Sequence, residues 1–188
     1  MPNLYIIGGA NGSGKTTASM SLLPNFLDCF EYINADAIAA ALSPFNQESV
    51  AIWAGRIMLE RLQTLSNSGT DFAFETTLAA RSFAAFLRSC KTKDYTINLI
   101  YFWLRSPELA VARVARRVAS GGHSIPEDVI RRHYDRGLRN LIALYLPLCD
   151  NWIIYDNSHE TAQLVAEGTI EEEQIIYNVE SWNQITQK

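Results

Sequence analysis

The sequence predicts an α/β fold in which a mostly parallel five-stranded sheet is covered by helices on both faces. Three observations support this. Short apolar runs alternate with segments of helical periodicity, which is the pattern of parallel strands joined by crossover helices. The first apolar run passes directly into a glycine-rich loop. The 188 residues are 48% hydrophobic and 19% charged, enough for one packed core, so we expect a single domain over residues 1–188.

The first half of the chain is predicted to alternate strands and helices. Residues 4–7 are apolar without interruption and stop at Gly8-Gly9, as a buried parallel strand does. A helix should follow over residues 15–23 and end at Pro24, because proline has no backbone N–H with which to continue it. The other elements expected in this half are a strand at 31–34 and helices at 37–42 and 47–65.

The second half continues the alternation. Residues 95–104 are rich in aromatic and β-branched side chains and carry the strongest strand signal in the chain. Further strands are expected at 72–74 and 152–155, and a helix at 80–90. Residues 163–165 and 175–177 are additional candidates for edge strands. Within residues 105–139, two more helices are predicted on either side of Gly121-Gly122.

A glycine-rich segment between the first strand and the first helix matches the phosphate-binding motif GxxxxGK[ST] at every specified position. Its glycines let backbone N–H groups curl around phosphate oxygens, and the following helix adds partial positive charge. Lys15 is expected to reach the β- and γ-phosphates of ATP, and the Thr16 hydroxyl to hold Mg²⁺. In this setting the motif predicts a three-layer α/β/α P-loop NTPase. The predicted nucleotide-binding residues are Gly9, Ala10, Asn11, Gly12, Ser13, Gly14, Lys15, Thr16, Thr17 and Asn157.

Gly9, Asp36, Glu75 and Asn157 each come just after a predicted strand. Since the carboxyl ends of parallel strands meet at one edge, these residues are expected on the rim where α/β proteins bind ligands. Asp36 could accept the proton of an attacking hydroxyl, or it could be the N-cap of the helix at 37–42. Glu75 could act near magnesium or contact an acceptor, or it could be an acid at a helix start. The residues alone leave these alternatives open.

Positive charge is concentrated in residues 105–139. The segment holds eight arginines, no lysine and four acidic residues, so its charge is +4 although that of the whole chain is −4. Arginines at helical spacing around a Gly-Gly hinge predict a lid that folds over phosphates; the alternative is a solvated surface. His123 and His133 are expected to pack in this lid or lie on its polar surface rather than bind a metal.

The composition argues against several classes of protein. A net charge of −4 disfavours binding along a nucleic acid. No run reaches the roughly 18 apolar residues of a membrane span, and the opening residues lack the basic region of a secretory leader, so we expect neither. Cys29, Cys90 and Cys149 are far apart and odd in number, which favours a reducing cytoplasm over a disulfide framework.

The motifs GANGSGKTT, YINADAIA, FETTL and RVASGGHSIPEDVIRRHYDRGLRNL together resemble the zeta-toxin family of P-loop kinases. They span residues 9–141 and are much more specific in combination than the P-loop alone. The resemblance implies an ATP-dependent kinase, since the best-known members phosphorylate a hydroxyl of UDP-N-acetylglucosamine. It implies an antitoxin protein as a candidate partner. It also implies a P-loop lysine at Lys15, a catalytic aspartate at Asp36, acceptor contacts at Glu75, Thr77 and Arg81, and lid arginines among Arg113, Arg117, Arg131 and Arg132.

One position departs from the family pattern. The well-known toxins carry a glycine after the glutamate, where this chain has Thr76 after Glu75. The resemblance places acceptor contacts on both sides of this position, so it supports kinase activity better than it supports a particular acceptor.

The sequence therefore predicts a kinase that transfers the γ-phosphoryl group of ATP to a hydroxyl of a small molecule, with UDP-N-acetylglucosamine as the first candidate. Two alternatives stay open. One is a P-loop kinase for another metabolite or for a nucleic-acid end. The other is a nucleotide-binding switch or ATPase without an acceptor, in which Asp36 would only cap a helix. The oligomeric state is left undecided.

Overall fold

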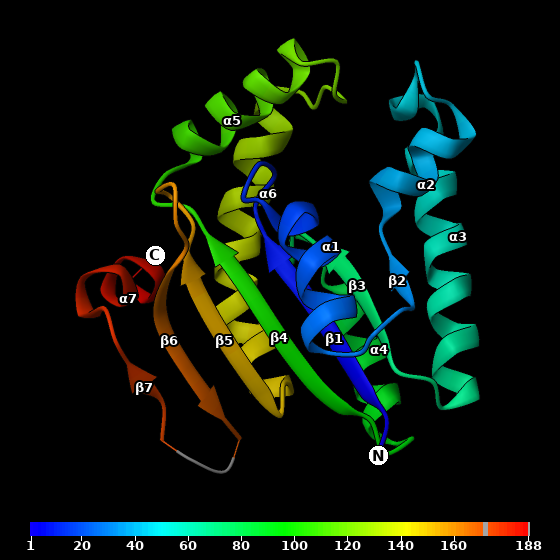
Figure 1. Cartoon of the computed structure of the whole chain (residues 1–188), viewed down its shortest axis with the longest axis vertical. Helices are drawn as coiled ribbons and strands as arrows, with labels where there is room; N and C mark the ends of the chain where they lie inside the picture. Colours follow the sequence, from blue (N-terminus) through cyan, green and yellow to red (C-terminus); the bar gives the residue numbers. More distant parts are fainter. Residues whose placement is uncertain (171–172, 188) are drawn as a thin grey trace.

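The computed structural model describes residues 1–170 and 173–187, and it confirms the predicted α/β fold. A seven-stranded sheet forms the centre of these residues, in the order β2-β3-β1-β4-β5-β6-β7 (Figure 1). The first five strands along the chain pair in parallel, whereas β6 and β7 are antiparallel. The strands are β1 Asn3–Gly9, β2 Tyr32–Ile33, β3 Phe72–Thr76, β4 Thr96–Trp103, β5 Asn151–Asp156, β6 Gln163–Thr169 and β7 Ile175–Ile176.

Helices cover both faces of this sheet. α1 lies on one face, and α4 and α6 lie on the other, while α2 and α3 stand beside β2 and α5 projects beyond the carboxyl ends of the strands (Figure 1). The helices are α1 Lys15–Phe26, α2 Ala35–Leu42, α3 Gln47–Ser68, α4 Ser82–Lys91, α5 Pro107–Ala119, α6 Glu127–Asn140 and α7 Val179–Thr186, with a π-helical turn Leu141–Tyr145 and a 3-10 turn Leu146–Leu148 after α6. None of the described helices is long and apolar enough to cross a membrane.

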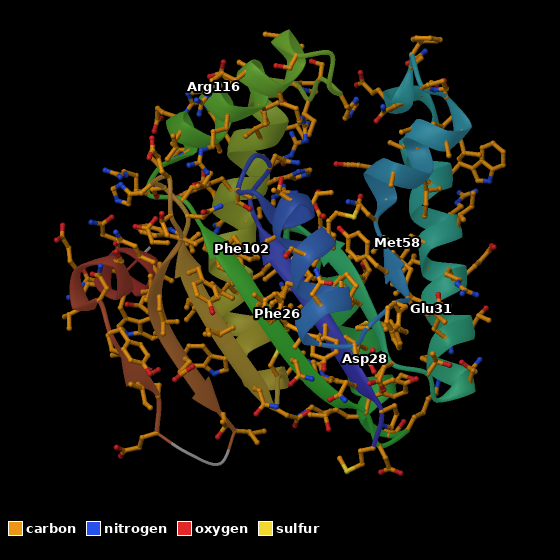
Figure 2. All side chains as sticks on the ribbon, in the orientation of Figure 1. Phe26, Asp28, Glu31, Met58, Phe102 and Arg116 are labelled. Carbon is orange, nitrogen blue, oxygen red and sulfur yellow. The ribbon has the colours of Figure 1, made fainter. Side chains whose placement is uncertain are left out.

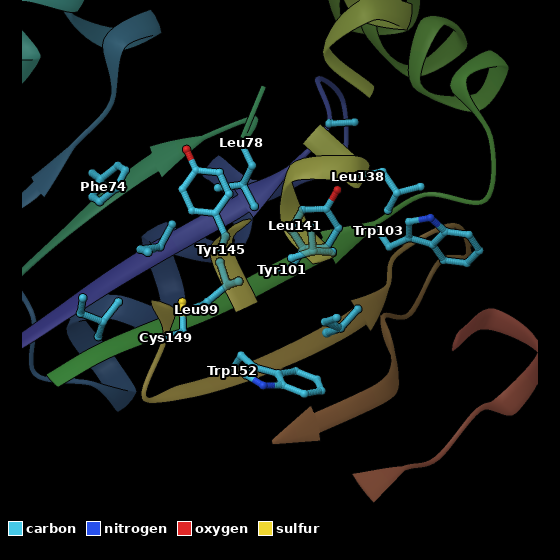
Figure 3. Packing of buried hydrophobic residues seen from close by; sticks show 14 of the residues in the cluster. Phe74, Leu78, Leu99, Tyr101, Trp103, Leu138, Leu141, Tyr145, Cys149 and Trp152 are labelled. Atoms are coloured by element: carbon cyan, nitrogen blue, oxygen red, sulfur yellow. The ribbon is translucent and has the colours of Figure 1, made fainter. Parts of the chain in front are cut away.

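Alternate residues of the strands supply the two halves of the core. On β1, Leu4 and Ile6 pack with the α4 and α6 side, whereas Ile7 packs with α1. Phe102 of β4 is buried on the α1 side and Met58 of α3 on the opposite side (Figure 2). Figure 3 shows the larger half, in which side chains from β3, β4 and α6 interlock. A rigid sheet packed on both sides therefore supports the loops at its carboxyl edge.

The predicted number of five strands is wrong. All five predicted parallel strands form, but the sheet continues past β5 through β6 and β7. The patterns at 163–165 and 175–177 fall on these two strands, and β6 extends to Thr169. The apolar run of β6 gives way to Glu167, Gly168 and Thr169, and β7 has only two residues, so periodicity gives a weak signal for both.

The predicted end of the first helix at Pro24 is also wrong, because α1 continues to Phe26. Proline removes one backbone donor but keeps helical φ, so it can occupy the last turn of a helix. The end is completed by bonds from the Leu27 N–H to the Leu22 carbonyl and from the Cys29 N–H to the Leu23 carbonyl, at 3.2 and 3.0 Å.

Candidate active site

The glycine-rich loop joins β1 to α1, as the motif predicts. Gly9 ends β1 with φ +146°, and a Cβ there would lie 2.4 Å from the Phe102 carbonyl oxygen, so a side chain does not fit. Gly14 precedes α1 with φ +88°, a left-handed conformation that glycine adopts at little cost. The loop is therefore held tightly against β4, with the N-terminus of α1 directed at the space it encloses.

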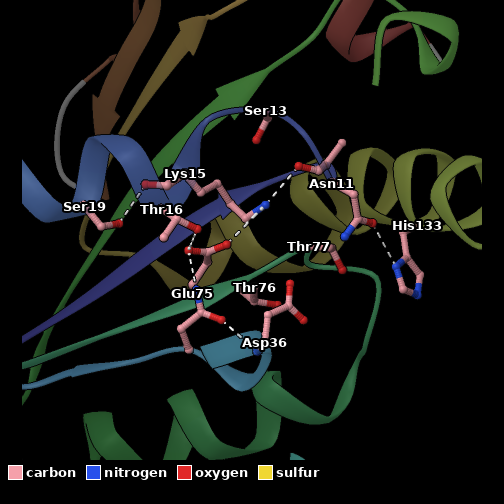
Figure 4. A network of polar contacts seen from close by, with 12 residues as sticks. Asn11, Ser13, Lys15, Thr16, Ser19, Asp36, Glu75, Thr76, Thr77 and His133 are labelled. Carbon is pink, nitrogen blue, oxygen red and sulfur yellow. Dashed lines mark hydrogen bonds and ion pairs between the residues drawn. The ribbon is translucent and has the colours of Figure 1, made fainter. Parts of the chain in front are cut away.

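Lys15 and Glu75 form the polar centre of the site (Figure 4). The Lys15 ammonium donates to the Ala10 carbonyl at 2.9 Å and lies 3.6 Å from Glu75 Oε1. Only 6% of the lysine side chain is exposed. Burial lowers the pKa of Lys15, and the negative charge of Glu75 opposes this shift.

The second oxygen of Glu75 accepts three hydrogen bonds. They come from Thr16 Oγ1 at 2.8 Å, Tyr32 Oη at 2.5 Å and Asn34 Nδ2 at 2.9 Å. Burial and the Glu75 charge raise the pKa of Tyr32, so its hydroxyl stays protonated and can donate. Among the roles predicted for Glu75, this geometry favours a role near magnesium, because the carboxylate contacts the side chains of both Lys15 and Thr16 in the P-loop. Tyr32 and Asn34 were not anticipated from the sequence.

An oxygen pair suited to Mg²⁺ is present at the start of α1. The Thr16 hydroxyl and the Glu75 carboxylate are hard oxygen ligands, held 2.8 Å apart beside the P-loop. These residues fit the metal that the sequence motif implies. Thr16 is exposed, whereas Glu75 is largely enclosed, so a bound cation would have both protein oxygens and open coordination positions for water and phosphate.

Asp36 does not cap a helix. α2 begins at Ala35, and its N-cap is Asn34, whose side-chain oxygen accepts from the N–H groups of Asp36 and Ala37 at 2.8 and 3.3 Å. The capping alternative for Asp36 is therefore wrong: Asn34 has the extended backbone of an N-cap and an equally suitable side chain. Asp36 is exposed in the first turn of α2, and its carboxylate takes no part in the cap of that helix.

Two clefts meet at this point. One, of about 520 Å³, is lined by the P-loop and the exposed part of α2, and we call it the P-loop cleft. The other, of about 500 Å³, lies over the segment after β3, and we call it the Thr77 cleft. The residues that line both are Asn11, Lys15, Asn34, Asp36 and Glu75. The shared boundary thus carries the lysine and the aspartate that the sequence predicted as catalytic.

The four predicted lid arginines divide into two pairs. Arg113 and Arg117 of α5 line the P-loop cleft, and the Arg117 guanidinium donates to the His123 carbonyl at 2.9 Å. Arg131 instead pairs with Glu108 and Glu127 at 2.6 and 2.8 Å, and Arg132 pairs with Asp128 at 3.4 Å; neither is among the lining residues of the two clefts. The α5 arginines thus line the P-loop cleft, whereas Arg131 joins α6 to α5 and Arg132 pairs within α6, both outside the two clefts.

The remaining predicted residues occupy different positions. Thr77 lines the cleft named after it, whereas Arg81 is exposed at the start of α4 and is not among the residues that line either cleft. Asn157 acts on the loop itself, because its side-chain amide donates to the Ser13 carbonyl at 2.7 Å. Asn157 therefore supports the P-loop.

His133 and Arg136 of α6 line the Thr77 cleft, although neither was selected from the sequence as a site residue. His133 Nδ1 lies 3.2 Å from Asn11 Oδ1 in the P-loop. Their position depends on the rotation of α6, which is set by burial of Ile130, Tyr134 and Leu138. The helical spacing of these buried residues is the signal in the sequence that could have located His133 and Arg136.

His133 is expected to make the fold less stable in acid. Burial lowers its pKa, and the charges of Arg132 and Arg136 lower it further. A histidine with a depressed pKa binds fewer protons in the folded state, so its contribution to stability is complete above about pH 6.5 and decreases as the pH falls below that value. Between about pH 7.5 and about pH 5.5 the Tm of the wild type should fall further than that of His133→Gln. His159→Gln, at an exposed histidine, is the control, and its Tm should change with pH as that of the wild type does. Equal falls in Tm for all three proteins would contradict this role of His133.

The sequence that forms this site matches a known protein family. Residues 1–167 match the sequence model of the zeta toxin family. The chain belongs to the zeta toxin family. An uncharacterized protein of Haemophilus influenzae is 32% identical over 128 residues, which make up 67% of this chain and 88% of that protein. The family resemblance predicted from the motifs is confirmed.

Solved structures share the fold of this zeta toxin family member. The AvrRxo1-ORF1:AvrRxo1-ORF2 complex with sulphate ions matches with a TM-score of 0.78, and the same complex with ATP with 0.77; each is 16% identical and covers 99% of this chain. This chain spans only 64% of the length of the AvrRxo1 chain. The PezAT toxin-antitoxin system of Streptococcus pneumoniae matches with a TM-score of 0.66 and 19% identity over 95% of this chain and 75% of that one.

Proposed function

We propose that this protein is an ATP-dependent kinase that phosphorylates a hydroxyl group of a small molecule. The observation that carries the proposal is the junction of the two clefts at Lys15 and Asp36. One cleft offers the donor site of a P-loop, the other offers space for an acceptor, and an uncommitted carboxylate lies between them. A kinase needs these three features in contact.

The P-loop cleft would hold ATP. The N–H groups of the loop and the N-terminus of α1 would bind phosphate oxygens, and Lys15 would exchange its bond to the Ala10 carbonyl for the β- and γ-phosphates. Thr16 and Glu75 would hold Mg²⁺, which neutralises phosphate charge when bound. Complexes of the AvrRxo1 relative include one with ATP, which supports this choice of nucleotide.

The Thr77 cleft would hold the acceptor with its hydroxyl beside Asp36. In the transfer step the hydroxyl oxygen bonds to the γ-phosphorus, the bond from phosphorus to the β,γ-bridging oxygen breaks, and ADP leaves. The hydroxyl proton passes to the Asp36 carboxylate. Because Asp36 lines both clefts and only its backbone N–H takes part in the cap of α2, its carboxylate can orient this hydroxyl and accept its proton.

UDP-N-acetylglucosamine is the first candidate acceptor. Family membership supports it, as do the Arg136 and His133 side chains that line the cleft, since they could bind a diphosphate and sugar hydroxyls. The existence of a second cleft favours a kinase over an ATPase that only positions water. By the same family argument we propose an antitoxin protein as a binding partner, as PezAT is a toxin-antitoxin system.

Mass spectrometry of UDP-N-acetylglucosamine after incubation with the protein, ATP and Mg²⁺ tests the proposal. The sugar nucleotide should gain the mass of one phosphate, with ADP formed in equal amount. No gain, combined with ADP formation on adding another hydroxyl compound, would remove this acceptor and keep the kinase. If no acceptor from a metabolite and oligonucleotide panel raises ADP formation above the acceptor-free rate, the kinase assignment itself is wrong.

The arginines of α5 are expected to stabilise the charge on the transferring phosphoryl group. Arg113→Ala and Arg117→Ala should each lower kcat by about 10²-fold, because each removes a cation that lines the P-loop cleft. Arg131→Ala is the matched control: it also removes an arginine, but one paired with Glu108 and Glu127 outside the clefts, and its kcat should stay within about 2-fold of wild type. Steady-state ADP release measures all three; a loss in Arg131→Ala equal to that in the α5 variants would contradict this division.

A further inference from the structure

One face of α6 contacts two different loops of the site. His133, Gly137 and Asn140 are spaced at i, i+4 and i+7, so they lie along one side of the helix. His133 meets Asn11 of the P-loop, whereas Gly137 and Asn140 meet the segment after β3. Tyr134 fastens the same helix to the end of β4 through a bond of 2.6 Å from its hydroxyl to the Leu104 carbonyl. α6 thus contacts three loops at the rim.

The segment after β3 has an unusual backbone. Leu78 is fully buried and has φ +59°, a left-handed conformation that residues with a branched side chain seldom adopt. Its N–H donates to Thr76 Oγ1 at 3.0 Å. Such a conformation persists only where neighbouring groups hold it, and it recurs at functional sites. Here it turns the chain so that Thr77, Ala79 and Ala80 line the Thr77 cleft.

The groups that hold this segment come from α6 and the turn that follows it. The Asn140 side-chain amide donates to the carbonyls of Leu78 and Ala79, at 2.8 and 3.2 Å. A Cβ on Gly137 would lie 2.2 Å from the Thr77 carbonyl oxygen, so the close approach of helix and segment requires glycine. The Tyr145 hydroxyl donates to the Ala80 carbonyl. Three successive carbonyls, at residues 78–80, are therefore bound by side chains that do not themselves line the cleft.

We propose that Asn140 is a positioning residue for the acceptor: by binding the carbonyls of Leu78 and Ala79 it fixes the wall of the Thr77 cleft against which the acceptor is oriented. The inference rests on the proposed function in taking this cleft as the acceptor site. It assigns no contact between Asn140 and substrate. Since the P-loop is tied to α6 separately through His133, loss of the Asn140 amide should disturb acceptor binding and leave the nucleotide site intact.

Two variants test this. Asn140→Asp keeps the size of the side chain but replaces its donor by an acceptor, and Asn140→Ala removes the donor without adding charge. In both, hydrogen exchange of the amides at residues 77–80 in the free protein should quicken by about 10-fold, while exchange at residues 10–15 stays within about 2-fold of wild type. Asn151→Asp is the matched control, because the Asn151 amide is exposed and donates to Asn98 at the opposite end of the sheet. In this variant the amides at residues 77–80 and 10–15 should exchange as in wild type.

Kinetics with UDP-N-acetylglucosamine provide the second measurement. The acceptor KM should rise about 10-fold or more in both Asn140 variants, with the KM for ATP and the acceptor-free hydrolysis of ATP within about 2-fold of wild type. Unchanged exchange at 77–80 overturns the proposal, and so does a loss that affects ATP and acceptor equally, which indicates a general structural role. If the wild type does not phosphorylate this compound, the failure belongs to the proposed acceptor, and the exchange experiment still decides whether Asn140 holds the segment.

Discussion

Replacing Lys15 by methionine is expected to lower phosphoryl transfer by about 10³-fold or more while leaving the protein folded. Among the described residues that line both clefts, Lys15 alone carries a positive charge, and its ammonium lies 2.9 Å from the Ala10 carbonyl and is enclosed by the loop. Methionine has a similar volume and no charge, so it fills the same space without reaching a phosphate. Steady-state ADP release in the presence of acceptor measures the effect.

The thermal stability of Lys15→Met distinguishes a catalytic role of the lysine from a structural one. Burial lowers the pKa of Lys15, because an ammonium removed from water loses solvation that the neutral methionine does not need. Glu75 keeps its three donors, Thr16, Tyr32 and Asn34, after the substitution. The Tm of Lys15→Met should therefore stay within about 3 °C of wild type. A large fall in Tm with a proportional fall in activity would show that the lysine mainly supports the loop.

The parts of the site that could be predicted from sequence are those contained in one short segment. The motif at residues 9–16 specifies its own conformation, because its glycines occupy left-handed or crowded positions and the strand and helix flank it directly. The alternation of β1 to β5 with helices was predictable for a similar reason, since most of these strands are short runs of mainly apolar residues. Asp36 and Glu75 were located on the correct edge because both follow such runs.

Features that depend on contacts between distant segments were not predictable. Glu75 is bound by Tyr32 and Asn34, which are more than 40 residues away, and no local pattern encodes that pairing. The division of the arginines depends on the acids that face them: Glu108 on α5 draws Arg131 away from the clefts. The position of Arg136 depends on the rotation of α6 about its buried residues. Charge and spacing alone indicate that phosphate-binding arginines are present, but not which of them reach the site.

Substitution of Asp36 by asparagine is expected to lower kcat by about 10³-fold, within the range attributed to a general base. Asparagine keeps the shape of the side chain and can orient a hydroxyl, but it accepts no proton at neutral pH. The KM for ATP should change by less than about 3-fold, because phosphate binding depends on the loop and on Lys15. Asp36 lies in the first turn of α2, where an acid contributes about 0.3–1 kcal/mol through the helix dipole, so the Tm should fall by no more than a few degrees.

Two controls make the Asp36 experiment decisive. Asp135→Asn removes an exposed carboxylate of α6 that is not among the lining residues of either cleft, and it should retain the activity of the wild type. Asn34→Ala removes the true N-cap and one donor to Glu75, so it should lower the Tm more than Asp36→Asn does. On the proposed mechanism, stability and activity should separate between neighbouring residues: loss of the cap at Asn34 should mainly lower the Tm, and loss of the Asp36 carboxylate should mainly lower kcat. If Asp36→Asn keeps a kcat within about 5-fold of wild type, proton acceptance by Asp36 is not part of the mechanism, and the acceptor hydroxyl must be activated by its position beside Lys15 and the bound nucleotide.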